Sequence, residues 1–109
     1  MNRLVALFLC APLLAACGTT SFSEVVLRPL APAHGPVPLY LKGQDVPKAY
    51  YDVALVQVVG SGSESAPDDV AAAVAARAGQ LGCDAVVRLE INQGMRRTQA
   101  AGVCVRFTP

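Results

Sequence analysis

The 109-residue chain carries nine Lys and Arg residues against eight Asp and Glu residues, and 53% of its residues are hydrophobic. The formal net charge is +1, so the chain lacks the basic footprint that nucleic-acid-binding proteins share. This composition excludes nucleic acid as an expected partner. The length allows one small domain.

The first sixteen residues have the layout of a secretory signal peptide. A polar start with Arg3 precedes an apolar stretch over residues 4–14, which ends in the small residues Ala15 and Ala16. The apolar stretch is about half as long as a membrane-spanning helix needs to be. It also has no polar face that would suit a helix packed at the surface of a domain. We therefore expect residues 1–16 to be a signal peptide.

The residues at the end of this segment resemble the lipobox of bacterial lipoproteins, in the form Leu14-Ala15-Ala16-Cys17. In that family a signal peptidase cuts before the cysteine, whose thiol carries a diacylglycerol and whose new amino group is acylated. The resemblance implies that Cys17 is lipidated and anchors the chain to membrane lipid. Gly18 stands where the family's inner-membrane retention signal carries Asp. This implies an outer-membrane lipoprotein of the cell envelope, facing the periplasm or the cell surface.

Residues 18–36 combine Thr, Ser, Pro and Gly around a short apolar patch at residues 25–27. Three prolines, Pro29, Pro32 and Pro36, exclude a helix here. We interpret residues 17–36 as a lipidated N-terminal tether with room for one edge strand. Residues 37–109 are then the folded domain.

The domain is predicted to belong to the α+β class. Its apolar patterns predict strands at residues 50–59, 84–91 and 100–107, with a further short strand at 37–41. A helix is predicted over about residues 67–81, where apolar residues recur at helical spacing. The order gives a small βαββ unit, with one helix packed on a three- to four-stranded, mostly antiparallel sheet.

The predicted core combines one face of the helix with one face of each strand. In residues 84–91, strict alternation places Ala85, Val87, Leu89 and Ile91 on one face and Val86, Arg88 and Glu90 on the other. The residues expected to be buried are Val70, Val74, Leu81, Val87, Leu89, Val103 and Val105.

Two cysteines of the mature chain, Cys83 and Cys104, remain after Cys17 is assigned to the lipid. An oxidising envelope compartment favours a disulfide between them. The strand pattern argues against it, because Cys104 alternates with Val103 and Val105 and so points away from the predicted core. A bond requires the two Cα atoms to lie within about 7 Å. Two unpaired buried thiols, each acting as a small apolar residue, are the alternative.

The segments ARAGQLGCDAVVRLEI (residues 76–91) and AAGVCVRF (residues 100–107) resemble a group of small bacterial envelope lipoproteins. The group includes the outer-membrane stress-sensor lipoprotein of the Rcs phosphorelay, and the resemblance covers about residues 50–107. It implies the same fold and compartment, and the position that matches Cys104 is disulfide-bonded in the stress sensor. The same helix-strand order also resembles a family of small oligomeric proteins labelled as heavy-metal binders.

The sequence offers no set of residues for metal binding or catalysis. His34 is the only histidine, and two thiolates fall short of the four ligands of a structural zinc site. The serines of GSGSES (residues 60–65) form neither a GxSxG elbow nor a phosphate-binding loop. No cofactor is expected. Arg96-Arg97 is the only basic doublet of the mature chain, and a solvent-exposed hairpin tip explains it without a partner.

We therefore expect a non-enzymatic cell-envelope lipoprotein that binds another envelope protein or senses the state of the envelope. Membrane attachment is expected to come from the lipid on Cys17 and not from a basic patch. A small oligomeric carrier of a ligand or a metal is the alternative.

Overall fold

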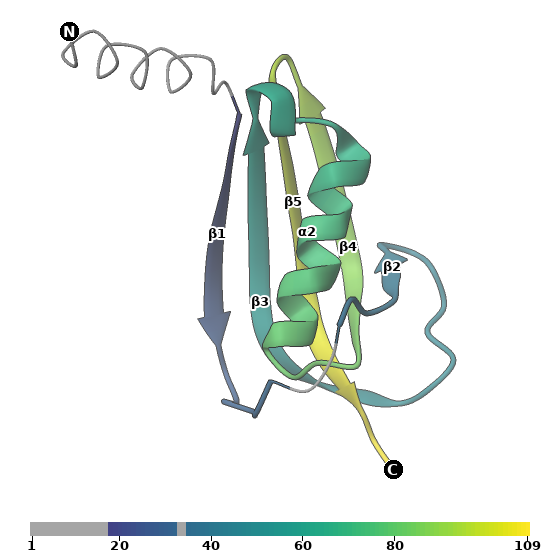
Figure 1. Ribbon diagram of the computed structural model, residues 1–109. Coiled ribbons are helices and arrows are strands. Elements are labelled where there is room, and N and C mark those ends of the chain that lie inside the picture. Colours follow the sequence, from purple (N-terminus) through teal and green to yellow (C-terminus); the bar gives the residue numbers. More distant parts are fainter. Residues whose placement is uncertain (1–17, 33–34) are drawn as a thin grey trace, which may run out of the picture.

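The computed structural model describes residues 18–32 and 35–109, which form an α+β domain with one helix on one face of a five-stranded sheet (Figure 1). The strand order is β1-β3-β5-β4-β2, and neighbouring strands are antiparallel except β2 and β4, which are parallel. The elements are β1 (Thr19–Val26), β2 (Leu39–Leu41), β3 (Tyr50–Ser61), the short 3-10 helix η2 (Gly62–Glu64), α2 (Pro67–Gln80), β4 (Ala85–Gly94) and β5 (Arg97–Phe107).

The predicted class and the helix-on-sheet arrangement are confirmed, and the sheet has more strands than the three or four expected. The added edge is β1, which pairs with β3 along its whole length, from Thr19 opposite Ser61 to Val26 opposite Ala54. Much of the segment interpreted as a tether is therefore a strand of the sheet. β4 and β5 are also longer than predicted, so that only Met95 and Arg96 remain as the turn between them.

The helix α2 ends in a glycine-based cap that directs the chain into β4. Gly82 has φ +84°, and its N–H donates to the carbonyl of Gly79, while the N–H of Cys83 donates to the carbonyl of Ala78. These two bonds form a Schellman motif, which satisfies carbonyls at the end of the helix. A Cβ at position 82 would also lie 2.6 Å from the carbonyl oxygen of Ala31, so glycine is required on two grounds.

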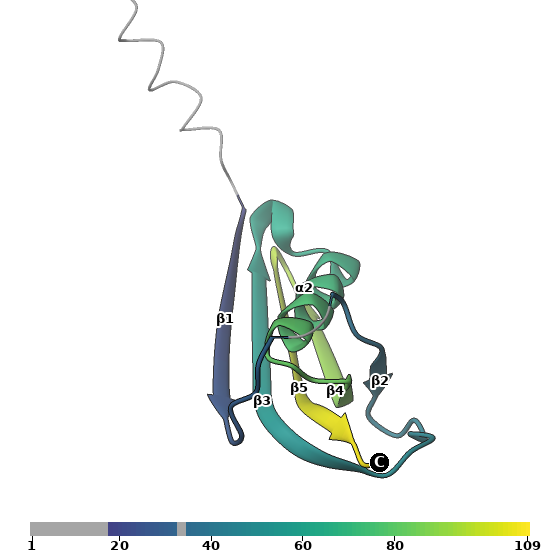
Figure 2. The same ribbon diagram turned by 60° about the horizontal axis from the view of Figure 1, so that its bottom comes forward.

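The main core lies between α2 and the sheet (Figure 2). The helix contributes Val70, Val74 and Ala78, which pack on the side chains that β3, β4 and β5 direct toward it. A smaller cluster lies on the opposite face, where Tyr40 and Val46 cover part of the sheet. Its buried members are Ala85, Val87 and Val105.

The predicted alternation of β4 is wrong beyond Val87. Pairing with β5 shifts between Val87 and Glu90, and Arg88 has φ +51°, which identifies a β-bulge at this point. The extra residue places Leu89 in the cluster beneath the helix, whereas Val87 belongs to the cluster on the other face. Five of the seven predicted core residues are buried, and the other two, Leu81 and Val103, are partly buried.

Candidate functional site

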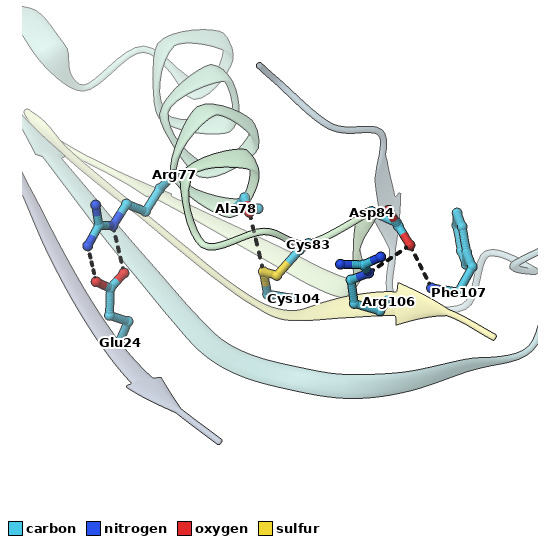
Figure 3. The surroundings of a disulfide bond; sticks show 8 residues. All are labelled: Glu24, Arg77, Ala78, Cys83, Asp84, Cys104, Arg106 and Phe107. Atoms are coloured by element: carbon cyan, nitrogen blue, oxygen red, sulfur yellow. Dashed lines mark hydrogen bonds and ion pairs between the residues drawn. A yellow bond between two sulfur atoms is a disulfide. The ribbon is translucent and has the colours of Figure 1, made fainter. Parts of the chain in front are cut away.

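The sequence predicted three site residues, Cys17, Cys83 and Cys104. The structure brings the last two together, and Cys17 lies outside the described residues. Cys17, the predicted lipidation site, is in the part of the chain that the structure does not describe. His34 lies outside it as well. Cys83 and Cys104 form a disulfide with their Cα atoms 5.7 Å apart (Figure 3).

The disulfide forms because the helix cap and the pairing of β5 each place one cysteine under the end of α2. Cys83 belongs to the turn before β4, so it does not follow the alternation of the strand. Cys104 pairs with Val86, and both lie in the cluster that faces the helix. The expectation that Cys104 points away from the core is therefore wrong, because the main core is on its face of the sheet. Both cysteines are fully buried.

Asp84, the residue after Cys83, connects the turn between α2 and β4 to the C-terminal end of β5. The carboxylate of Asp84 accepts a hydrogen bond of 2.9 Å from the backbone N–H of Phe107 and lies 3.4 Å from Nε of Arg106 (Figure 3). The N–H of Asp84 donates to the carbonyl of Val105 at 2.8 Å. The disulfide region is thus a structural junction between the helix end and the last strand.

A second junction holds β1 to the helix. The guanidinium of Arg77, on α2, donates through Nε to Glu24 Oε2 at 2.8 Å and through its terminal nitrogen to Glu24 Oε1 (Figure 3). The hydrogen bond from Arg77 holds the pKa of Glu24 below its usual value, and the hydrogen bond to Glu24 raises the pKa of Arg77. This bidentate ion pair holds β1 against the helix, in addition to the backbone ladder between β1 and β3.

The outer edge of β1 is open. Among residues 18–32 and 35–109, no strand pairs with it on the side away from β3. Natural edge strands are usually protected by lysine, proline or short length. β1 has eight residues, no lysine and no proline, and its one charged side chain, Glu24, is engaged by Arg77. Its backbone groups can therefore accept a further strand.

Apolar side chains gather along this edge. Phe22, Val25, Val26 and Leu27 are between 44% and 57% exposed, and Leu55 on the neighbouring strand is 46% exposed. Alternation along β1 directs Val25 and its partner Leu55 to the face away from the helix, and Phe22 and Val26 to the face on which Glu24 meets the helix, so the exposed apolar side chains line both sides of this edge. We call these five residues the β1 patch.

The β1 patch borders a shallow hollow on the sheet face opposite the helix. Its volume is about 480 Å³, and Val25, Leu55 and Val103 line its apolar part. The bulge brings Arg88 to the same hollow, where the guanidinium lies 3.6 Å from the carboxylate of Asp52. This pair is about half exposed, so it adds little stability and leaves both charges able to contact a bound molecule.

The described part of the chain holds no group of three or more His, Cys, Asp and Glu side chains close enough to bind a metal ion. No helix within it is both long and apolar enough to cross a membrane. Ser61 and Ser63, the first two serines of the GSGSES segment, lie at the end of β3 and in η2. The hydroxyl of Ser65 donates to the carbonyl of Gly62 and so closes the η2 turn.

The sequence indicated Cys83 and Cys104 and left room for an edge strand near the apolar patch at residues 25–27, but it did not show the full length of β1 or the bulge at Arg88. TTSFSEVV lacks a strict alternation of apolar and polar residues, so its strand signal is limited to its β-favouring Thr, Phe and Val residues, and the nearby prolines obscured it. Comparison with models of protein families, with curated proteins and with solved structures finds no match to this chain.

Proposed function

We propose that this chain is a non-enzymatic lipoprotein of the bacterial cell envelope, anchored through a lipid on Cys17, that binds an extended segment of another envelope protein along β1. The anchor is supported by the signal-like residues 1–16 and by the lipobox-like residues that follow. The binding role rests on one observation, the unprotected outer edge of β1 among exposed apolar side chains.

An extended partner segment fits both features of this edge. Its backbone would continue the ladder of the sheet beside β1, and its alternate side chains would reach Val25 and Leu55 on the open face. The disulfide and the Glu24–Arg77 pair would keep the edge rigid, which lowers the entropic cost of binding.

In-cell photocrosslinking tests this proposal. A crosslinking amino acid at Ser21, on the exposed β1, is expected to capture one defined envelope protein, whereas the same probe at Ala72, exposed on α2, is not. In the Ser21-probe background, Val25→Lys is expected to abolish the crosslink, because an inserted charge blocks strand addition at an edge. The matched control is Leu41→Lys, since Leu41 is similarly exposed on β2 at the opposite edge of the sheet.

Hydrogen exchange on the purified complex gives a second readout. The outward N–H groups of β1 are expected to gain protection when the partner binds, and those of α2 are not. Equal crosslinking from Ser21 and Ala72, or equal loss with Val25→Lys and Leu41→Lys, would contradict the proposal. A small molecule or metal retained by the purified protein in native mass spectrometry would instead favour the carrier alternative.

A further inference from the structure

The chain enters the sheet immediately after the predicted lipidation site. Gly18 precedes β1 by one position, and its Cα is packed so closely on η2 that a Cβ would collide with the side chains of Ser63 and Glu64. Consecutive Cα atoms are about 3.8 Å apart, so the Cα of Cys17 lies within one residue of this fixed point. A lipid on Cys17 therefore leaves no free spacer between the bilayer and the folded domain.

The turn between β4 and β5 lies at the same end of the sheet. Thr19 pairs with Ser61, and Ser61 pairs with Arg97, which follows that turn. Adjacent strands are about 4.8 Å apart, so the turn lies about 10 Å across the sheet from the start of β1. Figure 1 shows the start of β1, η2 and this turn together at one end, with the C terminus at the other.

The side chains of this turn suit the interface between lipid and water. Met95 is 95% exposed, the largest exposure among the large hydrophobic residues described, and Arg96 and Arg97 beside it are also exposed. Arg96 has φ +57°, a left-handed conformation that Gly or Asn adopts at lower cost in two-residue hairpin loops. Backbone strain of this kind is typical of functional sites, and here it coincides with an exposed methionine in the β4–β5 turn.

We propose that Met95, Arg96 and Arg97 form a second membrane contact, with Met95 in the headgroup region and both guanidinium groups on anionic phosphates. This rests on the proposed lipidation of Cys17, and it replaces the interpretation of the doublet as a merely solvated tip. Acidic Asp68 and Asp69 lie in the first turn of α2, so repulsion from anionic headgroups tilts the helix away from the bilayer and the sheet layer toward it. Glu64, in η2 beside Gly18, stays close to the anchor. The β1 patch then faces sideways, within reach of other envelope proteins.

Paramagnetic broadening on a lipid nanodisc measures this orientation. The mature, unacylated chain is coupled through its Cys17 thiol to a maleimide lipid in discs of phosphatidylethanolamine and phosphatidylglycerol that contain a gadolinium-chelating lipid. We expect the amides of residues 18–20 and 94–97 to broaden most, those of 67–70 less, and those of 43–48 least. Equal broadening along the chain, or strongest broadening at residues 43–48, would overturn the proposal.

Because the coupling is chemical, this result does not depend on whether the cell lipidates Cys17. Failure of lipidation would appear separately, in the mass of the native protein. A Cys17→Ser variant, which should not couple, confirms that the disulfide-bonded cysteines do not react with the maleimide lipid.

A charge-matched pair of double variants tests the two arginines. Arg96→Gln with Arg97→Gln removes two positive charges from the tip, and Arg28→Gln with Lys48→Gln removes two from the far end. On phosphatidylglycerol vesicles, the tip variant of the unacylated domain is expected to bind about 25-fold more weakly than the unmodified domain, at about fivefold per arginine. The control is expected to lose less than about twofold. Equal losses in the two variants, or none in either, would overturn the assignment.

Discussion

Removal of the Cys83–Cys104 crosslink is expected to lower the free energy of unfolding by about 3 kcal/mol. The bond closes a loop with a sequence separation of 21 residues, and the chain-entropy relation gives about 11 cal/mol/K for such a loop, which is about 3 kcal/mol at 25 °C. Because both cysteines are fully buried, the matched comparison is a Cys83→Ala, Cys104→Ala double variant against the oxidised protein. That variant adds no buried polar group.

Urea unfolding followed by circular dichroism measures the difference. The same titration with a thiol-free reductant separates the loss of the crosslink from the loss of sulfur packing, since the reduced wild type keeps both sulfur atoms. Labelling of the denatured, unreduced protein is expected to find no free thiol at Cys83 or Cys104. Two labelled thiols, or a stability that reductant leaves unchanged, would refute the reasoning.

Leu89→Ala is expected to lower the free energy of unfolding by about 2–5 kcal/mol, because Leu89 is 2% exposed beneath the helix. In the control Leu41→Ala, where Leu41 is exposed, the free energy of unfolding is expected to change by less than about 0.5 kcal/mol. Equal losses in the two variants in urea unfolding would contradict the core assignment. Glu24→Gln is expected to cost about 1–2 kcal/mol at pH 7 through the Arg77 bonds. The pKa of Glu24 is lowered in the folded state, so the stability lost in Glu24→Gln is fully lost above the unfolded pKa of about 4.3. The difference between the variant and the wild type shrinks as the pH falls through the lower folded pKa. A difference that persists near pH 2 would contradict the role of the ionised pair. Arg96→Gly is expected to stabilise the domain by about 0.5–1 kcal/mol in the same assay by relieving its left-handed backbone, and a destabilised variant would mean that the turn is not strained.

The regular parts of the fold could be predicted from local sequence pattern. Apolar spacing identified α2, and the valine-rich segment identified β3 to within two residues of its end. Both follow from short-range periodicity, which the chain carries without reference to its tertiary structure.

The junctions depended on tertiary contacts that periodicity does not encode. The bulge at Arg88 changes which face each later residue of β4 occupies, and no glycine marks it. The face of Cys104 depends on which side of the sheet α2 covers, and alternation alone leaves that choice open. β1 was obscured because its stability comes from pairing with β3, far along the chain, and from the Glu24–Arg77 pair.

Intact mass spectrometry of the protein extracted from membranes tests the central claim most directly. The account predicts a mature chain that begins at Cys17 and carries the added mass of a diacylglycerol and an amino-linked acyl group. A Cys17→Ala variant, as the control, is expected to be unacylated and mislocalised. A chain that retains residues 1–16, begins at another position or lacks the lipid mass at Cys17 would contradict the account.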